Sequence, residues 1–203
     1  MNVNILKTIL KDLIISSSLN DTSYILKNKS IIKDLDLPEP IYHTEISQNN
    51  ELVLDGKYML IDEIIVDGGK LTIKEGTSII CKSKTSISVI NNGKIFIEGT
   101  KVNPVTIKSS GDKTYFNGIL IQGNNDNVGK LKHLNITNGK NDNSFCIILE
   151  NVGNDTILNN ITITEITNEF KTPSVIGIGI IEGDPKITDS NFVNLFEDVI
   201  KIK

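Results

Sequence analysis

The segment from Gly69 to Gly123 repeats one phrase. It reads Gly69-Lys-Leu-Thr-Ile-Lys-Glu-Gly-Thr77 at its start, Gly93-Lys-Ile-Phe-Ile-Glu-Gly-Thr100 in its middle and Gly118-Ile-Leu-Ile121 near its end. The apolar pairs of these phrases lie about 24 residues apart, a period that is typical of solenoids. The repeat therefore predicts the fold but says little about function, because coils that stack on copies of themselves need no active site.

From about Glu51 onward, apolar pairs two residues apart recur between Gly, Asn, Asp, Ser and Pro residues, which is typical of short half-buried strands. Sorted by offset, the pairs predict three tracks, one through Leu71, Ile95 and Ile119, a second through Ile64 and Ile87, and a third through Ile79, Val105, Leu134, Ile161 and Ile187. Three strands per coil predict a parallel β-helix. A sandwich or barrel also has many short strands but does not require constant offsets.

Four phrases carry a family resemblance, and they span residues 68–79, 87–100, 103–110 and 116–123. They resemble the right-handed parallel β-helix repeats of the pectin-lyase-like superfamily, most closely its non-catalytic members in surface proteins and virion appendages. The resemblance covers about residues 52–203, and Phe116 stands where relatives often carry Trp. It implies the fold and leaves the function open, since the superfamily includes lyases, hydrolases, adhesins and phage tail proteins.

The N-terminal region follows a different pattern. Ile5, Leu6, Ile9, Leu10, Leu13 and Ile14 recur at helical spacing, and a second helix is predicted after Asn20-Asp21-Thr22-Ser23. Leu37-Pro-Glu-Pro40 predicts an extended connector. The predicted fold class is thus all-β, a right-handed parallel β-helix solenoid over residues 41–203 with a short α-helical cap or docking segment over residues 1–40.

Composition narrows the range of partners. The net charge is −4, all 21 basic residues are Lys, and Arg is absent, so the chain has no guanidinium fork for phosphate or carboxylate. No basic stripe with interleaved aromatic residues appears, and we expect no nucleic-acid binding. Cys81 and Cys146 lie in apolar strand-like runs, which predicts buried, inert thiols rather than a disulfide or a reactive group.

No pattern points to a catalytic, cofactor or metal site. The superfamily resemblance implies an Arg or Lys base beside acidic calcium ligands for lyases, and an Asp pair with Gly-His-Gly for polygalacturonase-like hydrolases; neither His43 nor His133 has that setting. A tailspike-type hydrolase needs only two close carboxylates, for which Glu150, Glu165 and Glu182 are the candidates. The loops 124–127 and 139–143 offer oxygen ligands for calcium, but ordinary Asn-rich turns are the favoured explanation, because Asn tolerates the left-handed conformation of sharp turns. We expect catalytic, cofactor-binding and metal-binding residues to be absent.

The sequence therefore favours a non-enzymatic structural or assembly protein. No export signal and no membrane-spanning stretch is recognisable, and we expect a virion component such as a tail, fibre or minor capsid protein. Its partners are expected to be other proteins or copies of itself, bound through the N-terminal helix and the open C-terminal end. The alternatives are a carbohydrate-binding or polysaccharide-cleaving surface module and a fragment of an extracellular bacterial adhesin.

Overall fold

The computed structural model describes residues 37–111, 114–123, 128–141, 144–165, 175–195 and 200–202. These residues form strands and turns, and no helix occurs among them. The helices predicted within residues 1–36 lie outside the described part of the chain. The first strand begins at Glu39, so the segment with Pro38 and Pro40 is extended, as the sequence predicts. Because the described residues contain no helix, none of them forms a helix that could span a bilayer.

The strands form three stacked tracks. Track 1 is a seven-stranded sheet of β2 (Thr44–Ser47), β5 (Ile64–Asp67), β8 (Ile87–Ile90), β11 (Ile119–Gln122), β13 (Phe145–Val152), β15 (Ile176–Gly183) and β18 (Ile200–Ile202). Track 2 contains β3 (Glu51–Leu54), β6 (Lys70–Lys74), β9 (Lys94–Glu98), the first halves of β12 (Gly129–Thr137) and β14 (Ile157–Thr164), and β16 (Lys186–Thr188). Track 3 contains β1 (Glu39–Ile41), β4 (Lys57–Leu60), β7 (Ser78–Cys81), β10 (Val105–Ser109), the second halves of β12 and β14, and β17 (Asn191–Val193).

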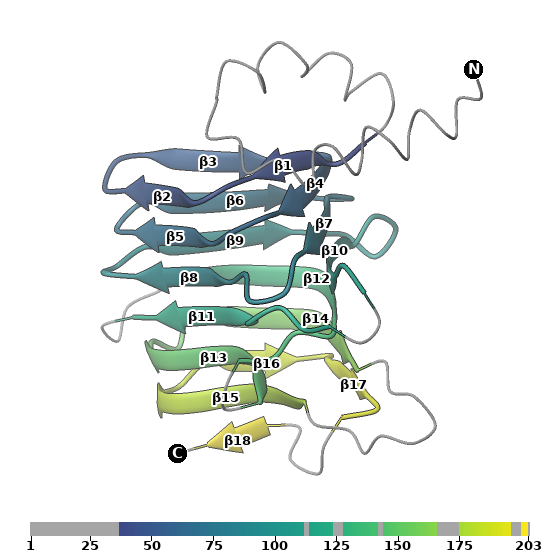
Figure 1. Cartoon of the computed structure of the whole chain (residues 1–203). Helices are drawn as coiled ribbons and strands as arrows, with labels where there is room; N and C mark the ends of the chain where they lie inside the picture. The colour runs from purple at the N-terminus through teal and green to yellow at the C-terminus, as the bar shows by residue number, and fades with distance from the viewer. Residues whose placement is uncertain are drawn as a thin grey trace, which may run out of the picture.

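The chain visits the tracks in a constant order, from track 3 to track 1 to track 2, and each strand pairs in parallel with its equivalents in the neighbouring coils. Tracks 2 and 3 belong to one eleven-stranded sheet because β12 and β14 run through both. The result is the stack of coils in Figure 1. The predicted parallel β-helix is confirmed.

Columns of identical or similar side chains fill the interior. Along track 1, the column of Ile64, Ile87, Ile119, Ile147 and Ile178 advances by one coil at each step, and every member is at most 2% exposed. Ile and Val suit this position because branched side chains pack well on like neighbours in a parallel sheet. Phe116 is fully buried in the same core, so its ring packs inside the coil at the position where relatives often carry Trp.

The repeated glycine marks the corner from track 1 to track 2. A Cβ on Gly69 would lie 2.4 Å from the carbonyl oxygen of Ile46, and a Cβ on Gly93 would lie 2.3 Å from that of Val66. The backbone of the preceding coil therefore leaves no room for a side chain there. This close approach is the physical reason for the glycine that opens the first two repeat phrases, whereas Gly118, which opens the third, lies at the corner from track 3 to track 1.

Asparagine supplies most of the sharp turns. Seven of the twelve described non-glycine residues with positive φ are Asn. At the corner between tracks 2 and 3, the positive-φ residues His133, Asn160 and Asp189 occupy equivalent places in successive coils. Asn and Asp tolerate the left-handed conformation better than most residues, which explains why the turns are rich in them.

The assignment of strands to tracks from constant offsets was wrong in two places. Leu71 and Ile95 do face each other, but Ile119 lies in track 1 beside Ile87. Ile187 lies in track 2 beside Leu158, not beside Ile161. The cause is variable coil length. One coil takes 19 residues, from Ile41 to Leu60, and another takes 34, from Ile95 to Gly129, so a fixed period moves a strand into the wrong track.

The coils already exceed the 24-residue period in the middle of the chain. Ile87 and Ile119, which are 32 residues apart, face each other in track 1. The added residues lie in turns, where length is tolerated because only the strands must keep their register.

The inward columns should dominate stability. Leu131 in β12 points inward and is fully buried, so Leu131→Ala should lower the free energy of unfolding by about 2–5 kcal/mol. Leu120 in β11 points outward and is half-buried, and Leu120→Ala should cost about 1 kcal/mol. Urea denaturation followed by circular dichroism measures both values. Equal losses in the two variants would contradict the inward columns as the main source of stability.

Candidate functional site

The outer face of track 2 carries two rows of side chains that cross successive coils. In the first row, Thr72, Phe96 and Lys130 stand opposite one another on β6, β9 and β12. In the second row, two residues further along each strand, Lys74, Glu98 and Lys132 do the same. Alternation explains the outward direction, because the residues between them, such as Ile95 and Ile97, are buried in the core.

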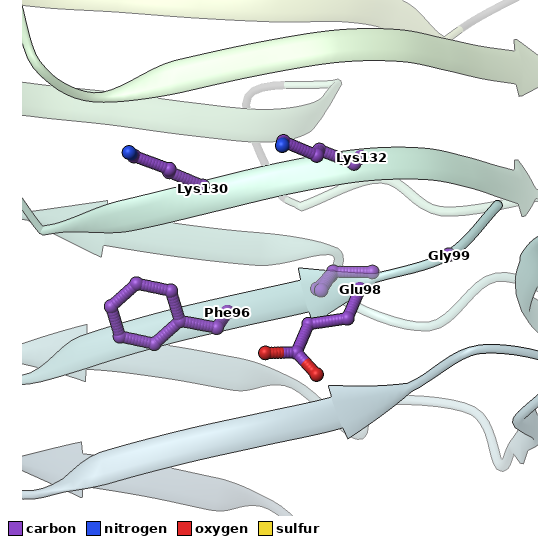
Figure 2. A pocket seen from close by; sticks show the side chains of 6 residues that line it. Phe96, Glu98, Gly99, Lys130 and Lys132 are labelled. Atoms are coloured by element: carbon purple, nitrogen blue, oxygen red, sulfur yellow. The ribbon is translucent and has the colours of Figure 1, made fainter.

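A groove of about 280 Å³ lies where these rows meet. Its lining consists of Phe96, Ile97, Glu98, Gly99, Lys130 and Lys132. Figure 2 shows Lys130 and Lys132 side by side on one strand, with Phe96 and Glu98 on the strand next to it. The groove thus combines one aromatic ring, one carboxylate and two ammonium groups on a rigid sheet.

Glu98 is engaged by the neighbouring coil. Its Oε2 accepts a hydrogen bond from Nζ of Lys74 at 2.5 Å, and this bond raises the pKa of the Lys74 ammonium group. The carboxylate on one side of the groove is therefore neutralised. Within the described part of the chain, Lys130 and Lys132 have no carboxylate within ion-pair distance. The groove is consequently cationic along β12.

Phe96 is half-buried and presents its ring to the same surface. Nζ of Lys70 lies 5.2 Å from the centre of the ring, close enough for a cation–π contact. Lys70 also forms a 3.0 Å ion pair with Glu51, which receives a further hydrogen bond from Thr72. These two bonds lower the pKa of the Glu51 carboxyl group.

The three carboxylates considered from sequence do not form one site. Glu150 stands on β13 opposite Gln122 and Ile181, and Glu182 takes a left-handed conformation near the end of β15. Both belong to the seven-stranded sheet. Glu165 follows β14 at the end of track 3, on another sheet. The pairing that a two-carboxylate hydrolase needs is therefore not available to Glu165.

Glu165 has a structural environment instead. It is only 1% exposed, its Oε1 accepts a 2.6 Å hydrogen bond from the hydroxyl of Tyr115, and its Oε2 accepts a 2.8 Å bond from the backbone N–H of Val175. Both oxygens are used, and they connect the end of β14 to the segments that precede β11 and β15. Nζ of Lys140 lies 4.2 Å from the centre of the Tyr115 ring. Such a buried carboxylate is a cross-link between coils rather than an accessible acid or base.

The remaining residues considered from sequence have clear positions. His133 is half-buried at the bend of β12, in the corner described above. His43 is exposed in the turn after β1. The loop 124–127 and residues 142 and 143 lie outside the described part of the chain. Phe96, Lys130 and Lys132 were missed as a site, although the alternation around Ile95 and Ile97 was sufficient to place Phe96 outward.

A match to a known protein family agrees with the parallel β-helix fold. Residues 44–130 match the model of a protein family described as a pectate-lyase like beta helix domain. This range includes Phe96 and ends at Lys130, so Lys132 lies just outside it. No curated protein and no solved structure matches the chain. Over residues 44–130 the chain is therefore similar to a pectate-lyase-like domain, and its fold is a parallel β-helix.

Neither thiol is suited to nucleophilic chemistry. Cys81 and Cys146 are both free and buried, and burial raises the pKa of Cys81 to about 12 and that of Cys146 above its usual range. This confirms the predicted buried thiols.

We expect Ellman's reagent to label neither Cys81 nor Cys146 within minutes in the native protein and to label both in guanidinium chloride, because only the exposed thiolate reacts. Absorbance at the released chromophore measures the number of thiols labelled. Rapid labelling of either cysteine in the native protein would contradict its burial.

Proposed function

We propose that this chain, a parallel β-helix similar over residues 44–130 to a pectate-lyase-like domain, acts as a non-catalytic binding module for an acidic polysaccharide. The observation that carries this proposal is the groove formed by Phe96, Lys130 and Lys132 on the outer face of track 2. A ring-shaped, negatively charged sugar unit matches both chemical features of that groove.

The groove offers a distinct role to each side chain. The apolar face of a sugar ring stacks on the ring of Phe96, as sugars do on aromatic side chains. The carboxylates of the polysaccharide pair with Lys130 and Lys132, whose Cα atoms lie roughly 6.6 Å apart because they are two residues apart on one strand. Lysine provides a point charge rather than a fixed fork, so we expect modest affinity that falls as salt is added.

The groove lacks the second carboxyl group that hydrolysis of the polysaccharide would need. Glycoside hydrolysis normally needs two carboxyl groups on either side of the bond that is cleaved. The groove has one, Glu98, and it is already bound to Lys74. Glu165 is enclosed by Tyr115 and Val175, on a different track.

The binding proposal can be checked with polygalacturonate as the probe and neutral dextran as its uncharged counterpart. In affinity electrophoresis or calorimetry, Phe96→Ala and the double substitution of Lys130 and Lys132 to Gln should each weaken polygalacturonate binding at least tenfold, or about 1.4 kcal/mol. Lys108→Gln is the matched control, since Lys108 is an exposed lysine on β10 of track 3.

A loss of the same size in Lys108→Gln would show that net charge alone drives binding and would contradict the proposal. Binding that is unaffected by Phe96→Ala would contradict the stacking role. The same solutions should be monitored for new reducing ends and for unsaturated products. Turnover that disappears in Glu150→Gln would contradict the non-catalytic assignment.

A second candidate function is a structural part of an assembly, and the outer face of track 1 favours it. One outward row of this sheet runs through Ile65, Ser88, Leu120, Ile148 and Gly179, and the next row includes Ile90 and Ile181. Ile65, Leu120 and Ile148 are each half-buried. The outward side chains of this face mix these apolar residues with polar ones, namely Glu45, Asp67, Ser88, Gln122 and Glu150. Apolar residues among polar ones are typical of protein–protein contacts.

We propose that copies of the chain pack through this face, within a virion or, alternatively, on a cell surface. The contacts predicted for the N-terminal helix lie outside the described residues, and the contact predicted for the C-terminal end stays a prediction. A stiff stack of coils suits such a role because each coil is bonded along its whole length to the next.

Light scattering across a range of concentrations tests the assembly proposal. We expect concentration-dependent self-association that Leu120→Lys abolishes, because a charge placed in an apolar contact must be desolvated. Thr106→Lys on the outer face of β10, in track 3, should leave it unchanged. A wild-type chain that stays monomeric at the highest concentration would contradict this second function.

A further inference from the structure

Two turns at the N-terminal end of the β-helix bring together residues that are distant in sequence. His43 lies in the turn between β1 and β2, and Asp62 and Glu63 lie in the equivalent turn between β4 and β5, one coil further on. The backbone N–H of Thr44 donates to the carbonyl oxygen of Glu63 at 3.0 Å, and that of Ile61 donates to Ile41 at 2.8 Å. These two bonds hold one turn directly against the other.

The three side chains converge on one point. Nδ1 of His43 lies 3.3 Å from Oε1 of Glu63, and one ligand-type atom from each of His43, Asp62 and Glu63 lies within 4.8 Å of the other two. The side chains of His43 and Glu63 are 53% and 39% exposed, so they have room to adjust and water has access. An imidazole nitrogen and two carboxylates therefore surround a solvent-accessible position.

We propose that His43, Asp62 and Glu63 form a binding site for a divalent first-row transition cation, with Zn²⁺ as its reference ion. Zinc binds imidazole nitrogen and carboxylate oxygen at roughly 2.0–2.2 Å, so two of its ligand atoms lie at most about 4.4 Å apart. The 3.3 Å pair already meets this limit, and small rotations of exposed side chains bring in the third ligand. Water completes the coordination from the open side.

The ligand set selects the class of ion. Calcium and magnesium prefer oxygen ligands alone, whereas an imidazole suits zinc, copper, iron and nickel. The presence of His43 among the ligands is therefore what favours a transition metal over calcium. This site is separate from the groove at Phe96 and does not depend on the proposed binding function.

Other charged groups of the protein oppose metal binding at this site. A plain ion pair between protonated His43 and Glu63 is the alternative for the 3.3 Å contact. The next coil contributes Lys82, whose backbone N–H donates to Leu60, so a third turn with two lysines, Lys82 and Lys84, follows that of Asp62. Their positive charges lower the affinity of the site, and we expect saturable but reversible binding rather than a permanently held ion.

A bound ion would connect the first coil to the second. Strands β1 and β2 each pair on one side only among the described residues, with β4 and β5. A metal that binds the folded form and not the unfolded form stabilises the former by mass action. Zinc should therefore raise the unfolding temperature of the chain.

The test uses the full chain without a histidine tag, titrated with zinc chloride in a calorimeter and unfolded by heat with and without zinc. We expect one zinc site per chain and a higher unfolding temperature with zinc. His43→Ala, Asp62→Asn and Glu63→Gln should each weaken binding at least tenfold and reduce the zinc-dependent rise. The controls are His133→Ala, the other histidine of the chain, and Glu45→Gln, an exposed carboxylate on β2.

Several outcomes would overturn the site. Zinc that fails to bind saturably would leave His43 and Glu63 as an ion pair only. Binding that survives all three ligand substitutions, or that is lost in His133→Ala alone, would place the ion elsewhere. Circular dichroism of each variant at low temperature separates a lost ligand from a misfolded chain, and Asp62→Asn and Glu63→Gln preserve side-chain size for the same reason.

Discussion

The fold depends on the parallel hydrogen-bonded contact between each coil and the next. Every described strand pairs in parallel with an equivalent strand one coil away. This backbone register stacks inward side chains such as Ile87, Ile119 and Ile147 into continuous columns. Stacking one coil on the next therefore buries the apolar side chains and pairs the backbone hydrogen-bonding groups at the same time. A coil without its neighbours would have neither. In the described residues, no buried side-chain nitrogen or oxygen lacks a hydrogen-bond partner, which agrees with this view.

The same register creates the surfaces on which function is proposed. Because residues two apart on a strand share a face, each track turns one set of side chains outward, and neighbouring coils align these sets into rows. On track 2 the rows combine Phe96 with lysines, whereas on track 1 they contain Ile65, Leu120 and Ile148. One helix of coils can therefore present chemically different faces in different directions. The corners add a third kind of surface, of which the turn holding His43 is an example.

Much of the fold was predictable because it depends on short-range pattern. Alternation identified inward residues such as Ile95 and Ile97, and the Asn-rich segments identified turns. The track of Ile119 was not predictable, because turns of different length separate the coils and a fixed period cannot follow them. The candidate site was only partly predictable: alternation places Phe96 outward, but the strand beside it, with Lys130 and Lys132, lies 34 residues further along the chain.

The sequence by itself determined the class of this protein, a parallel β-helix with inert buried cysteines and an interior of branched aliphatic residues. It could do so because period, alternation and glycine placement are local properties. Only the tertiary structure decided which side chains meet. The length of each turn sets the partner of every strand, and that register brought Lys130 to Phe96, His43 to Glu63 and Tyr115 to Glu165. Contacts of this kind depend on the path of the chain between coils, which no local pattern records.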